Sequence, residues 1–373
     1  MKKITVYDKY IFNQVLMTTI VAILLFTIVW IAPEMLLNTI KKVLSGDMTL
    51  KTGIMVLVYE IPKILGKAFP VGLLLGSLFT FDKLSKDSEL TIFRAVGMSF
   101  SRILCPLLIL SFIITYLCFI TYDKWIPYSC QKLYNIKEHS VLTQYIYAQR
   151  DSNDHPKRAV IVSRFFDGEM SDVIVMNFSD KIYSDLHGLD SVLVAEKGYK
   201  GTTKNGESCW NLNNITFYDI DNNGIFNFVK KYDKMNILEG DASENAYELM
   251  VNSTKRDRDF TNAELRRYIK LLKQERMDED YRLMLNKYFQ RFFHPFVCIL
   301  LAIMGCLLGF SKPREQRLIG FTIAIACIFG YYITLPFFDL LAEKGVLPPL
   351  ITASLPLIAF SCAIVAFYKS RDL

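Results

Sequence analysis

Three ionisable residues interrupt the apolar stretch "YEIPKILGKAFPVGLLLGSLFTF" at residues 59–81. Glu60, Lys63 and Lys67 follow the spacing i, i+3, i+7, which places them on one face of a helix. A carboxylate at membrane depth is costly and can serve as a proton or ion site. Lysines on the same face can instead bind phosphate as mobile point charges, or they can simply snorkel to the interface as anchors.

The helix that carries this face belongs to a membrane protein. The chain has 373 residues, of which 52% are hydrophobic, and its mean hydropathy of +0.25 is high for a soluble chain of this length. A helix needs roughly 20 apolar residues to cross the hydrocarbon, and five charge-free runs reach that length. They are Tyr10 to Pro33, Ile103 to Tyr122, Phe292 to Ser311, Leu318 to Phe338 and Gly345 to Tyr368. With the stretch above, beginning near Ile54, the sequence predicts an α-helical membrane protein with six transmembrane helices, three on each side of a large insert.

The insert has the pattern of an all-β domain. Runs such as "AVIVSRF", "DVIVMNF" and "NITFYDI" are rich in β-branched and aromatic residues and are separated by turn-forming clusters, which predicts a sandwich, jelly roll or barrel. Thr261 and Glu264 have capping-box spacing and should begin a helix that returns to the membrane. We divide the chain into residues 1–122 with three spans, 123–287 with the β domain and flanking helices, and 288–373 with three spans.

The distribution of lysine and arginine predicts the orientation. Most of these residues fall in the short loops on the side of the N-terminus, whereas the opposite short loops hold only Lys41, Lys42, Lys51 and Lys344. Positive loops stay in the cytoplasm, so both termini are expected there and the β domain outside. The net charge of +6 is mostly this signal and does not indicate nucleic-acid binding.

Motifs for catalysis are missing from the sequence. It has no G-x-x-x-x-G-K-[ST] loop, no G-x-S-x-G elbow and no H-E-x-x-H pair, and its four histidines are scattered without metal-ligand spacing. We expect no catalytic residue, metal or cofactor, so that energy must come from an ion gradient or a partner. Of the eight cysteines only Cys130 and Cys209 are expected in an oxidising compartment, and a disulfide between them is one alternative that no spacing supports.

The loop "DKLSKDSELTIFRAVGMSFSR" at residues 82–102 predicts a short cytoplasmic helix at about 85–97. Ser85 or Asp87 could cap it, and Gly97 could end it in the left-handed conformation. Leu90, Phe93 and Arg94 then form one face, which fits docking into a groove of a partner protein. An interfacial helix lying on lipid headgroups is the alternative.

The order of several segments resembles the LptF/LptG (YjgP/YjgQ) family of lipopolysaccharide-export permeases. These segments are "DKYIFNQVLMT", "FPVGLLLGSL", "SELTIFRAVGMS", "KYFQRFFHPFVCILLAIMG" and "GVLPPLITASLPLIAF". The resemblance implies a heterodimer with a paralogous permease in the bacterial inner membrane, an external β-jellyroll-like domain on each subunit, a cytosolic ATPase dimer and a periplasmic jellyroll protein that forms the transport bridge. It places Glu89 in the coupling helix that engages the ATPase.

The same resemblance suggests roles for basic residues and glycines. Lys41, Lys42 and Lys63 match positions where the LptG-type subunit carries lysines facing lipopolysaccharide, so the chain is more similar to LptG. Lys137 could take another such position, while Lys67 shares the helix face but has no clear counterpart. Two G-x-x-x-G pairs, Gly72 with Gly76 and Gly305 with Gly309, allow close helix packing, and the resemblance suggests lateral gates at spans one and five.

The sequence thus predicts a permease subunit that passes lipopolysaccharide from the inner membrane to a periplasmic bridge. One alternative is a secondary transporter driven by an ion gradient, with Glu60 as its ion site. The other is a membrane scaffold that transports nothing and binds a partner through its β domain.

Overall fold

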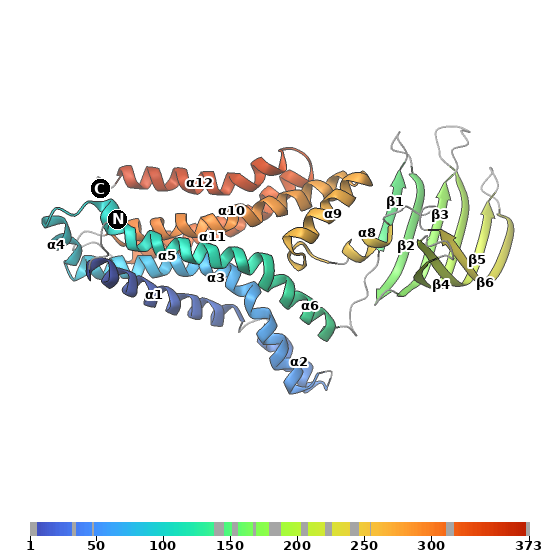
Figure 1. The fold of residues 1–373 in the computed structure, drawn as a ribbon, viewed down its shortest axis with the longest axis horizontal. Helices are drawn as coiled ribbons and strands as arrows, with labels where there is room; N and C mark the ends of the chain where they lie inside the picture. Colours follow the sequence, from blue (N-terminus) through green and yellow to red (C-terminus); the bar gives the residue numbers. More distant parts are fainter. Residues whose placement is uncertain are drawn as a thin grey trace. The chain divides into compact units, whose positions relative to one another are not determined.

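The computed structural model describes residues 6–31, 35–46, 48–137, 145–150, 156–166, 169–178, 188–202, 208–220, 226–238, 246–253, 255–310 and 317–370. The chain forms two compact units (Figure 1). A helical unit comprises Met1–Ile136, Asp257–Arg266 and Glu279–Leu373, and a second unit comprises Lys137–Arg256 and Arg267–Asp278.

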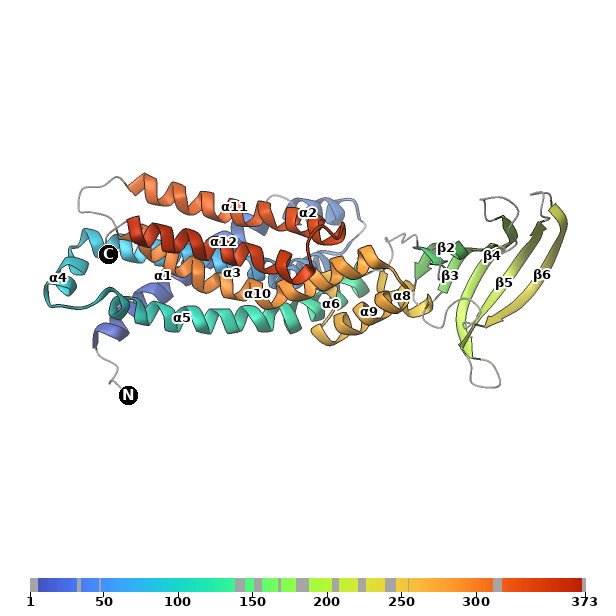
Figure 2. The ribbon, with the colours of Figure 1, turned by 90° about the horizontal axis from the view of Figure 1, so that it is seen from above.

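Six helices among the described residues are long and apolar enough to span a membrane, which confirms the predicted number. They are α1 (Val6–Ile31), α3 (Leu50–Lys86), α5 (Phe100–Ile120) with its continuation, α10 (Asp278–Gly309), α11 (Arg317–Glu343) and α12 (Pro349–Ser370). A π-helical turn at Thr121–Trp125 joins α5 to α6 (Ile126–Lys137), and the short helices α2 (Leu37–Leu44) and α4 (Glu89–Ala95) flank α3. The long helices run roughly parallel to one another (Figure 2).

Helix α3 forms the centre of the helical unit. In its most apolar window 78% of the residues are buried, against 28% in α1 and 11% in α11. Leu73 and Phe81 pack into a cluster with residues of α1 and α5, while Leu74 and Leu78 pack into a second cluster with α10, α11 and α12. Because both clusters include α3, the helices on its two sides are held together through it.

The four glycines of the G-x-x-x-G pairs lie where helices approach closely. Gly72 and Gly76 of α3 face Ile23 and Thr19 of α1, and a Cβ added to Gly76 would lie 2.7 Å from Thr19 Cα. Gly305 and Gly309 of α10 face α3, and a Cβ on Gly309 would lie 2.8 Å from the Leu78 carbonyl oxygen. Any larger residue at these positions would push the helices apart.

The second unit contains an antiparallel six-stranded sheet with strand order β1-β2-β3-β4-β5-β6. The strands are β1 (Tyr145–Arg150), β2 (Pro156–Phe166), β3 (Glu169–Phe178), β4 (Leu189–Thr202), β5 (Ser208–Ile220) and β6 (Phe226–Leu238). This confirms the inserted all-β domain. A jelly roll has two packed sheets with long crossing connections, whereas the described strands form one meander in which each strand pairs with its sequence neighbours.

Side chains along alternate positions of the strands bury one face of the sheet. Val160, Val173, Leu193 and Trp210 are at most 4% exposed. Helix α8 (Ala246–Ser253) packs beside β1. Cys130 of the helical unit and Cys209 of the sheet are both buried free thiols in this structure.

Helix α9 (Asn262–Gln274) begins at the predicted capping box. The Glu264 backbone N–H donates to Thr261 Oγ1 at 3.3 Å, and the Thr261 backbone N–H donates to Glu264 Oε2 at 2.8 Å. The two bonds satisfy N–H groups that the first turn of a helix otherwise leaves without acceptors.

Replacing Gly76 by alanine should destabilise the helical unit, because the new methyl group meets the Thr19 backbone. Overpacking of this kind typically costs about 1–3 kcal/mol. The matched control is Gly330→Ala in α11, where an added Cβ meets nothing within 4 Å. Thermal unfolding in detergent should show a lower midpoint for Gly76→Ala than for Gly330→Ala, and equal midpoints would contradict the close contact between α1 and α3.

Candidate functional site

Two of the three charged residues on this face of α3, Glu60 and Lys63, form an ion pair with each other. Lys63 Nζ lies 3.0 Å from Glu60 Oε2, and the two side chains are 16% and 9% exposed. Glu60 is therefore the partner of a cation rather than a carboxylate open to solvent. The exposed residue of the three is Lys67, one turn further along the helix.

A third cation, which the sequence pattern did not indicate, joins this face. Arg258 lies in a 3-10 turn, Asp257–Asp259, within electrostatic range of Lys67. Arg258 and Lys63 also both lie within electrostatic range of the Cys130 thiol of α6. The basic face of α3 is thus directed toward the segment that returns to the helical unit, and only tertiary structure brings Arg258 there.

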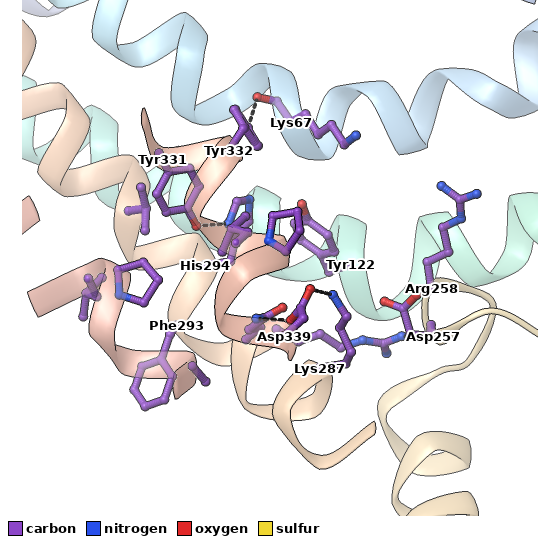
Figure 3. Close-up of a pocket in the computed structure, with 18 residues that line it drawn as sticks. Lys67, Tyr122, Asp257, Arg258, Lys287, Phe293, His294, Tyr331, Tyr332 and Asp339 are labelled. Carbon is purple, nitrogen blue, oxygen red and sulfur yellow. Dashed lines mark hydrogen bonds and ion pairs between the residues drawn. The ribbon is translucent and has the colours of Figure 1, made fainter. Parts of the chain in front are cut away.

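Beside this face lies a cavity of about 270 Å³ (Figure 3). Lys67 and Arg258 belong to its wall, together with Tyr122 and with side chains of α10, α11 and α12. The Tyr332 hydroxyl donates to the Lys67 carbonyl oxygen at 3.0 Å, and His294 Nδ1 is hydrogen-bonded to the Tyr331 hydroxyl. The cavity therefore combines charged, aromatic and aliphatic surfaces within the helical unit.

Asp339 of α11 organises the polar side of the cavity. Its Oδ1 accepts hydrogen bonds from Asn286 Nδ2 and Gln290 Nε2, both at 2.8 Å, and its Oδ2 pairs with Lys287 Nζ. Thr352 of α12 donates to Asn286 Oδ1 at 2.8 Å. One carboxylate thus receives three donors from α10 and, through Asn286, links α10, α11 and α12.

Arg291 fixes the segment that carries Arg258. Arg291 is 6% exposed, and its guanidinium donates to the Phe260 carbonyl oxygen at 2.8 Å, to Asn262 Oδ1 at 3.1 Å and to the Asp257 carbonyl oxygen. A buried charge is tolerated when hydrogen bonds satisfy it. These bonds hold Asp257 and Arg258 against α10.

At the opposite end of α3, helix α4 differs in part from the prediction. It begins at Glu89 rather than near residue 85, because α3 continues to Lys86 and Ser88 then adopts a left-handed φ of 61° without a side-chain cap. The proposed caps by Ser85 and Asp87 are therefore wrong. Gly97 has a φ of 84°, as expected for the residue that ends the helix.

The face of α4 formed by Leu90, Phe93 and Arg94 is turned toward the chain itself. Leu90 is buried, Phe93 packs on Tyr7 with ring centroids 4.6 Å apart, and Arg94 lies over the Phe310 ring. Leu90 and Phe93 thus pack against the chain itself, while Arg94 stays exposed. The exposed apolar side chains of α4 are instead Ile92 and, just beyond its end, Val96, at 58% and 77% exposure.

Glu89 connects α4 to α1. The Tyr10 hydroxyl donates to Glu89 Oε1 at 3.1 Å, and Gln14 Nε2 donates to the Tyr10 hydroxyl at 3.0 Å. Nearby, Arg102 of α5 pairs with Asp8 at 2.6 Å. Side-chain contacts therefore join α4 to the first turns of α1.

The remaining basic residues lie apart from the cavity lining. Lys41 and Lys42 are exposed on α2. Lys137 is the last residue of α6, and its side chain lies outside the described part of the chain. Of the expected phosphate-binding lysines whose side chains are described, Lys67 is the one that lines this cavity.

Comparison with known proteins gives a family match. The family model described as "Lipopolysaccharide export system permease LptF/LptG" matches residues 9–370, nearly the whole chain. The curated proteins contain no significant match. Together with the six apolar helices, the family match indicates a multi-pass membrane protein.

Replacing Asp339 by alanine should destabilise the helical unit, because Lys287 then loses its counter-ion while only 25% exposed. Breaking such a largely buried pair costs about 3 kcal/mol. The double variant Lys287→Met/Asp339→Leu should recover much of this loss, since it leaves no unpaired charge. Thermal unfolding in detergent measures both.

The control for this prediction is Glu279→Ala. Glu279 pairs with Lys344 at 3.6 Å, but both side chains are more than 60% exposed, so its loss should cost at most about 1 kcal/mol. A shift for Asp339→Ala no larger than that for Glu279→Ala would show that Asp339 does not hold the helices together.

Proposed function

Because the chain belongs to the LptF/LptG family of lipopolysaccharide export permeases, we infer that it is the membrane subunit of an ABC transporter that extracts lipopolysaccharide from the bacterial inner membrane. Its partners would be a paralogous permease, a cytosolic ATPase dimer and a periplasmic jellyroll protein to which the lipid passes. The chain itself would carry no catalytic residue. The observation that carries this inference is the family match from residue 9 to residue 370, which includes α4, the sheet and all six spans.

The proposed topology has both termini and α4 in the cytoplasm and the sheet in the periplasm. Lysine and arginine favour the loops on the side of the termini. The start of α1, the end of α12 and α4 all lie at one end of the helical unit (Figures 1 and 2). An ATPase bound at that end would reach α4 directly.

Helix α4 would couple the ATPase to the spans. Ile92 and Val96 offer an exposed apolar contact beside Glu89, the kind of short helix that docks in a groove of another protein. Glu89 and Phe93 contact Tyr10 and Tyr7 of α1. Movement of α4 would therefore displace α1, which packs on Gly72 and Gly76 of α3. We assign the lateral gates to α1 and α11 on this basis and on the family relationship.

Lysines would attract the phosphate groups of the transported lipid. Lys41 and Lys42 are exposed on α2, beside the start of α3. Lys63 is held by Glu60 and would reach phosphate by exchanging partners. Lys137 would add a further cation, as in an LptG-type subunit, and the exposed Lys67 follows one turn after Lys63.

Removing the Tyr10 hydroxyl should separate ATP hydrolysis from transport. In vesicles containing the complete transporter, Tyr10→Phe should bind the ATPase normally but move less lipopolysaccharide per ATP hydrolysed, because it loses the exposed hydrogen bond to Glu89, worth about 1 kcal/mol. Glu89→Ala should lose both ATPase binding and transport. Tyr116→Phe is the matched control, since Tyr116 is 67% exposed on α5. Equal transport by Tyr10→Phe and Tyr116→Phe would contradict coupling through α1.

Replacing Glu60 by glutamine distinguishes the permease from an ion-driven transporter. Per folded protein, Glu60→Gln should retain ATP-dependent transport, because Glu60 serves here as the partner of Lys63. Transport should also persist when a protonophore collapses the ion gradient. Loss of transport in both conditions would favour the secondary transporter.

Photocrosslinking from the sheet distinguishes a transport permease from a scaffold that transports nothing. A photoreactive residue on its buried face, at Val173 or Leu193, should form lipid adducts during ATP-driven transport. Adducts with proteins alone would favour a scaffold.

A further inference from the structure

Two side chains of opposite charge hold the segment 257–262, where the chain rejoins the helical unit. This unit is interrupted after Ile136 and resumes at Asp257, so the residues between them form the insert that carries the sheet. The two side chains are Arg291 of α10 and Asp123 of the π-helical turn between α5 and α6. Together with Asn262, which contacts both, they are called the clasp below.

Asn262 is bonded to both charged side chains of the clasp. Its backbone N–H donates to Asp123 Oδ1 at 3.1 Å, although 139 residues separate the two in sequence. Its side-chain Oδ1 accepts from Arg291 Nη1 at 3.1 Å. The N–H belongs to the first turn of α9, where backbone donors lack acceptors within the helix and a carboxylate is favoured. Asp123 therefore fixes the start of α9 to the junction of α5 and α6.

Arg291 fixes the rest of the segment. Its Nη1 also donates to the Phe260 carbonyl oxygen at 2.8 Å, and its Nη2 donates to the Asp257 carbonyl oxygen. Arg291 is buried, and so is the Phe260 side chain. A guanidinium presents its donors in a rigid fork, so the three acceptors specify one position of the segment against α10.

The π-helical turn also contacts α3. A Cβ added to Gly66 of α3 would lie 3.2 Å from the Tyr122 ring, so this ring lies directly on the helix backbone. On α6, the Cys130 thiol lies beside the Asp259 carboxylate. Isolated π-helical turns are rare and often occur at functional sites. The clasp thus joins the two chain segments that flank the insert to each other and to α3 and α10.

Both ends of the insert therefore depend on one set of hydrogen bonds. Without these bonds, the segments before residue 137 and after residue 256 would shift independently when the helices move. We propose that Asp123 and Arg291 are positioning residues for the transfer of lipid from the helical unit to the sheet, because the closed clasp passes a movement of α3 against α10 to both ends of the insert together. This role rests on the proposed function and concerns one step of it. ATP hydrolysis and entry of lipid from the membrane do not require the clasp.

The test uses the complete transporter in vesicles with lipopolysaccharide and ATP, with a photoreactive residue at Val58 of α3 or at Val173 of the sheet. Val58 is 53% exposed and precedes Lys63 on α3. Asp123→Ala should lower the lipid adducts at Val173 about fivefold, the effect of one typical net hydrogen bond. ATP hydrolysis and the adducts at Val58 should stay unchanged.

Two further variants separate the clasp bonds from folding. Asn262→Ala keeps the N–H but removes the acceptor for Arg291, and it should give the same pattern as Asp123→Ala. Asp123→Asn keeps an oxygen that can accept the N–H and should retain most of the transfer. The matched control is Lys124→Ala, because Lys124 is exposed on the same turn, and its adducts should equal those of the wild type.

Hydrogen–deuterium exchange of residues 257–262 reports whether the clasp has opened, and it should be faster in Asp123→Ala than in the wild type. The proposal is overturned if this exchange is unchanged, or if it rises while the adducts at Val173 stay at the wild-type level. It is also overturned if ATP hydrolysis and the adducts at Val58 fall together with those at Val173, which would indicate a purely structural role. Absence of lipid adducts at both positions of the wild type would contradict the proposed function itself, and the role of the clasp with it.

Discussion

The cost of placing charge in hydrocarbon governs the layout of the helical unit. A charged side chain at membrane depth needs a partner or access to water, and the ion pairs named here lie toward the two ends of this unit. Glu60 with Lys63 and Asp339 with Lys287 lie toward one end. Asp8 pairs with Arg102 toward the other. The middle is left to apolar contacts and to hydroxyl groups that bond to their own helix, such as Ser77 to the Leu73 carbonyl oxygen at 2.7 Å.

Helix α3 connects the two ends of the helical unit, where the ion pairs lie. Its glycines accept α1, and the glycines of α10 accept α3, so helix backbones meet where no charge lies between them. At one end α3 carries the basic face opposite Arg258. At the other it leads into α4 through the left-handed Ser88. A central helix with a basic face toward one end and α4 at the other suits the permease function proposed above.

The features that could be predicted from the sequence are those set by local pattern. Long apolar runs predicted the six spans, and alternating β-branched runs predicted the strands. The capping box at Thr261 and the end of α4 at Gly97 were predictable because each depends on residues close in the sequence. The order of the strands in the sheet could not be predicted, because alternation indicates which residues are buried but not which strands are neighbours.

The features that could not be predicted depend on contacts between residues far apart in the sequence. The face of α4 was predicted to be open, yet Phe93 meets Tyr7 and Arg94 meets Phe310, which come from distant parts of the chain. Arg258 lies within electrostatic range of Lys67, on a segment that Arg291 holds by hydrogen bonds. Asp339 could be read as an ordinary residue at the end of a span until three donors of α10 were seen to converge on it.

The most direct test of the central claim is mild extraction of the wild-type chain from native membranes, with mass spectrometry of the proteins and lipids that accompany it. A permease of this family, driven through α4, should bring with it a cytosolic ATPase, a paralogous membrane subunit and lipid A species, and the chain separated from them should hydrolyse no ATP. Recovery of the intact chain without an ATPase, or ATP hydrolysis by the chain alone, would contradict the account.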